Sequence, residues 1–417
     1  MTQIRTQRPE HPTSRLNSLL LSARLLLAGL VMATVLFGES LALASEGTIA
    51  VRGGKLFLAA DDRNVLDGGV LVVEEGRITK VGSSRDTMIS STTEVVDASG
   101  RWVVPGFVDC HNHTAGDLGD LNDMIYQTNP GLRTLDVVVP DSADMEASRS
   151  GGVTCVLLIP GSGTNMSGFG TVVKTSGRTQ EEVGIRFPGS LKIAQGDNPK
   201  RYWFRVERTM MNYTLRDALT KGSEYANDED RVHDPRMEMY RGLFARQFPV
   251  SVHTQRYQLV MKSIQMLHDE FGLWTVLDHS TMSGFYAAPL AVERDIFTIV
   301  GPRQFHFDAN ERRFFGCAAE WSHRGVQKIG INTDSPVVPQ ESLKTQAAMA
   351  CHFGLDSLVA LRGLTIVPAR ALGVGDRCGS LEVGKDADFG IWSGNPLDPR
   401  SRLERLYIEG RLVYEGP

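Results

Sequence analysis

The middle of the chain, residues 105–373, repeats one pattern eight times: a short apolar run is followed by a longer stretch of other residues. The apolar runs are GFVDC, GVTCVLLIP, TVVKT, SLKIAQ, FPVSVH, LWTVLDH, IFTIV and KIGINTD. Apolar runs that alternate with helical stretches are typical of βα units and of a parallel sheet. Eight units predict an α/β fold with a (β/α)8 TIM-type barrel, whose active site lies at the carboxyl ends of the strands.

The two ends of the remaining chain, residues 45–104 and 374–417, share a different pattern. Short Val, Ile and Leu runs are separated there by Gly, Asp and Asn. This pattern is typical of antiparallel strands that are joined by tight turns. We therefore predict that both ends form one composite β-sandwich-like subdomain, and that residues 105–373 form the barrel domain.

The first 44 residues predict a signal peptide. A basic leader precedes the apolar run 25–37, and Ala42-Leu43-Ala44 fits a small-residue cleavage site. The apolar run is shorter than the roughly 20 residues that span a bilayer. We expect cleavage near Ala44 and Ser45 and export to the periplasm or the cell exterior, with an uncleaved anchor as the alternative.

Composition excludes several other functions. The net charge is −5 and no basic patch with interleaved aromatic residues is present, so we expect no nucleic-acid partner. No segment beyond the leader is long and apolar enough to predict a membrane span. The five cysteines show no C-x-x-C pair, and none is assigned to catalysis. Formation of a homo-oligomer stays open.

Four histidines and one aspartate close the predicted strands. His111 and His113 follow the first strand, while His253, His279 and Asp334 close three later ones. His-x-His alone also suits a solvated strand end, although both rings would share one face of a strand. Ligand-type residues at the ends of several strands of one barrel favour a metal site.

The sequence resembles the amidohydrolase superfamily of metal-dependent hydrolases, in its imidazolonepropionase-like and prolidase-like branches. The resemblance rests on VVPGFVDCHNH, the segments around His253 and His279, INTDSPV and the closing LEVGKDADFGIWSGNPLD. It covers essentially the whole chain after the leader. It implies one or two divalent metal ions in the barrel mouth, commonly zinc.

The resemblance also implies individual ligands. His111, His113 and Asp334 would bind one buried ion, and His253 and His279 would bind a second ion or the substrate.

Members with two ions also need a bridging ligand, often a carboxylated lysine. Lys192, in GSLKIAQGDNP, is our candidate, and Asp197 at the end of the same strand is the alternative.

A bound ion would polarise the substrate carbonyl and activate a water molecule. Asp334 would accept the proton of that water and pass it to the leaving nitrogen, and His279 or a residue of a lid would stabilise the oxyanion. No acidic residue follows His253 closely, which favours hydrolysis of an amide over deamination of a ring. We expect an exported amidohydrolase acting on a small molecule or short peptide. The alternatives are an ester or phosphotriester hydrolase and an inactive barrel that serves as a binding module.

Three further segments could border the site. Residues 114–150 and 198–247 are long insertions that predict a lid, or else a surface helical hairpin. Arginines within 201–208 could clamp a substrate carboxylate or form surface ion pairs. GSGTNMSGFG, residues 161–170, lacks the ending of a phosphate loop and predicts a mobile loop over the barrel.

Overall fold

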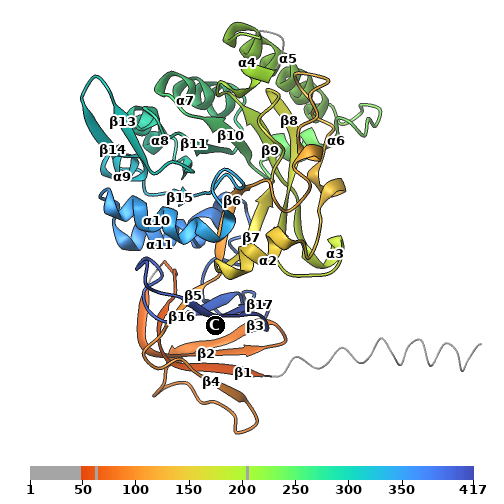
Figure 1. Cartoon of the computed structure of the whole chain (residues 1–417). Coiled ribbons are helices and arrows are strands. Elements are labelled where there is room, and N and C mark those ends of the chain that lie inside the picture. The colour runs from red at the N-terminus through yellow and green to blue at the C-terminus, as the bar shows by residue number, and fades with distance from the viewer. Residues whose placement is uncertain (1–47, 62–63, 203–205) are drawn as a thin grey trace, which may run out of the picture. The chain divides into compact units, whose positions relative to one another are not determined.

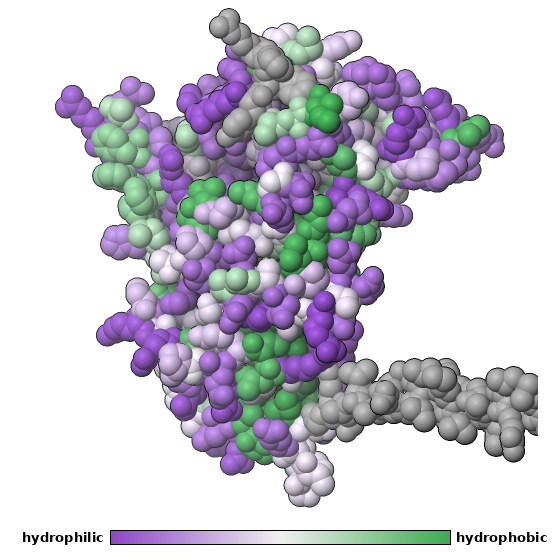
Figure 2. All heavy atoms as spheres, turned by 45° about the vertical axis from the view of Figure 1, so that its right-hand side comes forward, coloured by the Kyte–Doolittle hydropathy of each residue, from purple (hydrophilic) through white to green (hydrophobic). Residues whose placement is uncertain are grey.

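The structure is a computed structural model, and it describes residues 48–61, 64–202 and 206–417. The predicted signal peptide and its cleavage site near residue 45 lie outside the described residues. No helix in the described part of the chain is both long enough and apolar enough to cross a membrane. Hydrophilic side chains cover most of the face in Figure 2.

Strands from both ends of the chain form one eight-stranded sheet (Figure 1). The strands are β1 (Ile49–Phe57), β2 (Val65–Glu74), β3 (Arg77–Ser83), β4 (Glu94–Asp97), β5 (Trp102–Pro105), β16 (Phe389–Trp392), β17 (Leu403–Ile408) and β18 (Arg411–Glu415). The sheet order is β18-β17-β16-β5-β1-β2-β3, with β4 beside β1. The composite β-subdomain is thereby confirmed, but its strands are not all antiparallel, because β1 pairs in parallel with β4 and β5.

The second eight-stranded sheet is the barrel. Its strands are β6 (Phe107–Asn112), β7 (Val153–Leu158), β8 (Met166–Lys174), β9 (Gly184–Ala194), β10 (Val250–Thr254), β11 (Thr275–His279), β12 (Phe297–Val300) and β15 (Ile329–Ile331). All eight apolar runs therefore form strands, in the order β15-β12-β11-β10-β9-β8-β7-β6. The backbone N–H of His113, which follows β6, donates to the carbonyl of Ser335, which follows β15, at 2.9 Å. This hydrogen bond connects the two edges of the sheet.

One strand of the barrel runs against the others. β8 is antiparallel to both β7 and β9, which differs from the all-parallel barrel that the sequence predicts. The cause is the short turn 159–165, because a connection of that length returns the chain without a crossover helix. The prediction of a mobile loop at 161–170 is wrong for Met166–Gly170, which is the first half of β8.

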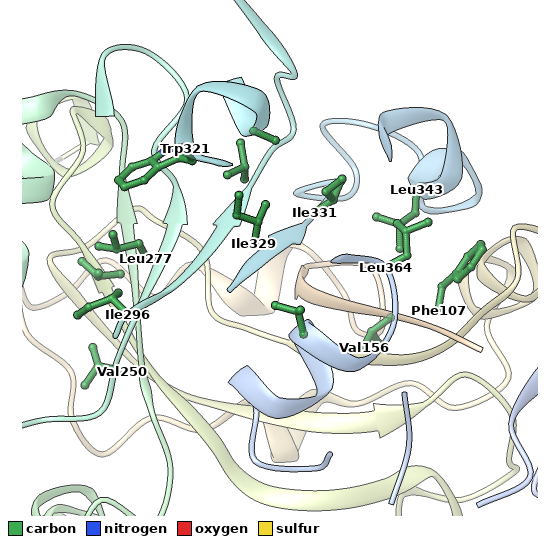
Figure 3. Close-up of a cluster of buried hydrophobic side chains, with 14 of the residues drawn as sticks. Phe107, Val156, Val250, Leu277, Ile296, Trp321, Ile329, Ile331, Leu343 and Leu364 are labelled. Carbon is green, nitrogen blue, oxygen red and sulfur yellow. The ribbon is translucent and has the colours of Figure 1, made fainter. Parts of the chain in front are cut away.

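Helices surround the barrel and cover its outer apolar face. They are α2 (Ala143–Ser150), α3 (Gln180–Val183), α4 (Asn198–Tyr202), α5 (Arg208–Asn227), α6 (Glu238–Phe244), α7 (Tyr257–Ser263), α8 (Ala288–Glu293), α9 (Cys317–His323), α10 (Leu343–His352), α11 (Ser357–Gly363) and α12 (Ile366–Ala371). Leu277 and Ile329 from the strands share one buried cluster with Trp321 and Leu343 from the helices (Figure 3). This layer holds the strand ends in place.

The two insertions cover the outer face of β8, which has no crossover helix of its own. Tyr240 of α6 donates its hydroxyl to Met166 Sδ at 3.4 Å, and Phe248 packs edge-on against Phe169. From the first insertion, the carbonyl of Leu132 accepts a hydrogen bond from the N–H of Phe169. The insertions are therefore part of the barrel wall, and a lid function for them stays a prediction.

A buried ion cluster joins the barrel to the C-terminal segment. Lys174, at the end of β8, pairs with Asp386 at 2.9 Å and with Asp388, and all three side chains are almost fully buried. Arg77 from β3 also pairs with Asp386, at 2.7 Å. Burial alone would lower the pKa of Lys174, but Asp388 and Asp386 raise it overall, so the lysine is charged.

Replacement of Lys174 should therefore destabilise the protein strongly. Lys174→Met leaves the buried carboxylate of Asp388 without its cation, which costs about 3–5 kcal/mol of unfolding free energy. Lys221→Met is the control, because Lys221 forms an exposed ion pair with Asp217, and exposed ion pairs contribute little to stability. Urea denaturation of both variants measures the difference, and equal stabilities would contradict the assignment.

Candidate metal centre

Three predicted ligands meet where the first and last strands of the barrel adjoin. His111 is in β6, His113 follows that strand, and Asp334 lies three residues after β15. Oδ1 of Asp334 is 3.5 Å from Nε2 of His111 and 3.3 Å from Nε2 of His113. One ligand atom from each of the three residues lies within 4.8 Å of the others, a spacing that one metal ion can bridge.

Two further histidines adjoin this group. The ring centroid of His279 is 4.5 Å from that of His111 and 4.3 Å from that of His253. Nε2 of His253 and Nε2 of His279 are buried, and neither has a hydrogen-bond partner within the described part of the chain. A buried nitrogen without a partner is costly, so these two atoms require a ligand or water.

The backbone at His279 brings two successive side chains to the same place. In a regular strand Asp278 and His279 would face opposite sides. His279 has φ 67°, in the left-handed region, where β11 ends. As a result, Asp278 and His279 both contact His111. Asp334 also has a positive φ, 52°, and such strain in non-glycine residues is often found at functional sites.

All four histidines contact a partner through Nδ1. Their Nε2 atoms differ: that of His111 contacts Lys192 and Asp334, that of His113 contacts Asp334, and those of His253 and His279 have no partner within the described residues. The Nδ1 partners are Asp278 Oδ2 for His111 at 3.0 Å, the Ile159 carbonyl for His113 at 2.8 Å, Ser162 Oγ for His253 at 3.1 Å and the Gly301 carbonyl for His279 at 2.8 Å. A carbonyl or carboxylate partner keeps the proton on Nδ1, which leaves the Nε2 lone pair for a metal.

The charge states of the site also suit a metal. Burial lowers the pKa of His111, His253 and His279, so these rings are neutral at pH 7. Burial alone would raise the pKa of Asp334, but His279, His113 and His253 lower it overall, so the carboxylate is ionised. Neutral imidazoles with an anionic carboxylate are typical zinc ligands. The residues present therefore fit a divalent transition metal.

Lys192 lies inside this group of residues. Its Nζ is 3.0 Å from Nε2 of His111, and its side chain is fully buried in β9. Burial lowers the pKa of Lys192 to about 8. The alternative bridging residue, Asp197, instead forms an ion pair with Arg208, which also donates to the carbonyl of Gln195. For the arginines within 201–208 the sequence allows a substrate clamp or ion pairs with neighbouring acids. Arg208 forms an ion pair.

Sequence reasoning missed three residues that position these ligands: Asp109, Ser162 and Asp278. Asp109 accepts hydrogen bonds from the N–H of His111 and from the N–H and hydroxyl of Thr333, so it ties β6 to the loop that carries Asp334. Asp109 and Asp278 each interrupt an apolar strand close before a histidine. A charged residue inside such a run is the signal that could have identified both.

The contact between Asp278 and His111 leads to a prediction about metal affinity. Asp278→Asn removes the carboxyl group that orients His111, and the loss of such a partner typically lowers metal affinity about 10–100-fold. Competition with a chromophoric chelator measures that affinity.

The matched control is Asp269→Asn, because Asp269 contacts His268 Nδ1 at the same 3.0 Å near the surface. An unchanged affinity in Asp278→Asn would show that the contact does not orient a ligand.

Comparisons with known proteins identify relatives of this chain. A family model described as the amidohydrolase family matches residues 275–413. A solved amidohydrolase from Thermotoga maritima MSB8 is 31% identical, with a TM-score of 0.79 over 88% of this chain and 100% of that one. The imidazolonepropionase of Aromatoleum aromaticum is 28% identical over 370 residues, 81% of this chain and 88% of that protein. Amidohydrolase tasK of Hapsidospora irregularis is 24% identical over 396 residues, 84% of this chain but only 40% of that protein.

Proposed function

Because this chain belongs to the amidohydrolase family, we propose that it is a metal-dependent hydrolase that cleaves the carbon–nitrogen bond of a small amide or cyclic amide. One observation carries the metal dependence: the buried Nε2 atoms of His253 and His279 have no hydrogen-bond partner within the described residues, and both rings adjoin the group of His111, His113 and Asp334. Relatives named imidazolonepropionase support a substrate with a carbon–nitrogen bond. A short peptide is the other substrate class in this proposal.

We assign the ligands by position. His111, His113 and Asp334 would hold one ion, and His253 and His279 would hold a second. A bound ion of this kind polarises a carbonyl and lowers the pKa of water.

Lys192 would be the bridging ligand. An ammonium group among these residues would repel a cation, whereas a carboxylated Lys192 would supply an anionic oxygen.

Two side chains of the site, Asp334 and His279, have different roles in this proposal. Asp334 is ionised and lies beside both His111 and His113, so it can accept a proton at Oδ1 and deliver it to the leaving nitrogen. His279 faces the carbonyl of Gly301 with Nδ1, so its proton is on Nδ1 and its Nε2 has a lone pair. This arrangement supports a ligand role for His279 over the predicted role as an oxyanion donor.

The function is tested by removing ligands and measuring metal and activity together. In His111→Ala/His113→Ala we expect loss of bound metal and a fall in amide turnover of at least about a thousand-fold, because a metal contributes several kcal/mol to such catalysis. Elemental analysis and a panel of dipeptides and cyclic amides provide the two measurements. Full turnover by the double variant would exclude the mechanism.

Lys192→Ala then separates the two kinds of centre. A fall from two ions per protomer to one or none supports the bridge, whereas one ion in both proteins indicates a mononuclear centre.

Export is a separate proposal, and the leader sequence supports it. We expect the mature protein to begin near Ser45 when the full chain is expressed in a bacterium with a periplasm. N-terminal sequencing of the periplasmic and membrane fractions measures this. An intact leader in the membrane fraction would indicate the uncleaved anchor instead.

A further inference from the structure

We infer that the segment 121–129, termed the rim loop, forms an apolar wall of the substrate site and selects substrates with an apolar side chain next to the scissile bond. This inference rests on the proposed function. It concerns specificity, and it assigns no part of the bond cleavage to the loop.

Backbone hydrogen bonds hold the rim loop along the turn between β7 and β8. The carbonyl of Leu121 accepts from the N–H of Gly161 at 2.8 Å, and the carbonyl of Gln127 accepts from the N–H of Asn165 at 3.0 Å. Asn129 N–H donates to the carbonyl of Met166 at 2.8 Å. Both ends of the rim loop are thus fixed to one turn.

That turn contacts a candidate metal ligand. Ser162, in its centre, lies 3.1 Å through Oγ from Nδ1 of His253. Side chains of the rim loop lie on the glycines at either side of Ser162. A Cβ atom on Gly161 would be 2.0 Å from Oδ1 of Asn122, and one on Gly163 would be 3.1 Å from Sδ of Met124. Met124 thus contacts the residue that follows Ser162, whose hydroxyl contacts His253.

Three successive side chains of the rim loop are apolar and exposed. Met124 is 37% exposed, Ile125 70% and Tyr126 69%. The centre itself consists of imidazoles, carboxylates, a lysine and hydroxyl groups, which offer little surface to an apolar group. Removal of a large apolar side chain from water is favourable, so a substrate that covers these residues gains affinity. Met and Tyr also adapt well to apolar ligands of different shapes.

The charge of the rim loop argues against an anionic substituent at this place. Asp123 is within the loop and Asp120 precedes it, and both are exposed. A negatively charged side chain of a substrate would be repelled by these two carboxylates. The expected order of preference is therefore leucine over serine over glutamate at the substituent that the rim loop contacts.

The test compares dipeptides with a single varied side chain. Leu-Gly, Ser-Gly and Glu-Gly vary the residue before the scissile bond, and Gly-Leu, Gly-Ser and Gly-Glu vary the residue after it. We expect the zinc-loaded wild-type protein to prefer leucine over serine by about 10-fold or more in kcat/KM in one of the two series. In Ile125→Ser/Tyr126→Ser this ratio should fall towards one, through a higher KM at unchanged kcat.

Val139→Ser is the matched control, because Val139 is an exposed apolar residue of the same insertion outside the rim loop. The control should keep the wild-type ratio. An unchanged ratio in the double variant, or a wild-type protein that does not distinguish leucine from serine, contradicts the inference and leaves the proposed function intact. A wild-type protein that binds zinc but cleaves neither dipeptides nor cyclic amides contradicts the proposed function, and the inference with it.

Discussion

The candidate centre depends on the hydrogen bond that each histidine makes through Nδ1. The four partners come from three places: the side chain of Asp278 in β11, the carbonyl of Ile159 and the hydroxyl of Ser162 in the turn between β7 and β8, and the carbonyl of Gly301 after β12. Each partner is at the end of a strand or in the turn that follows one. Because these three places lie far apart in the sequence, the rings take these orientations only when the barrel is closed. The histidine rings are therefore oriented for metal binding in the same step in which the barrel folds.

The polar interior of the barrel mouth is costly, and the surrounding structure offsets this cost. Asp109, Asp278 and Lys192 are fully buried, and burial raises the pKa of both aspartates and lowers that of the lysine. Such groups are tolerated where they are paired or bind a metal. The apolar layer between strands and helices supplies the stabilisation, and strained residues such as His279 are held in place by it.

The strands and the approximate location of the site could be predicted from sequence because burial leaves a local pattern. Eight apolar runs mark eight buried strands, and His111, His253 and His279 lie at the ends of three of them, whereas Asp334 lies three residues after β15. The direction of β8 was predicted wrongly, since an apolar run indicates burial and says nothing about direction. Contacts such as Asp278 with His111 could not be predicted, because they join strands that lie far apart in the sequence. Only the folded chain places Lys192 beside His111 and Asp197 beside Arg208.

The reversed direction of β8 has a further consequence for how this chain can vary. A crossover helix normally shields each strand of such a barrel, but here Tyr240 and Leu132 from the two insertions contact β8, together with Phe248, which directly follows the second insertion. The insertions therefore take the place of a missing structural element. Shortening either one would expose an apolar strand of the barrel to water. Changes in their length are thus constrained by the solubility and folding of the whole domain, even at positions that never approach a substrate.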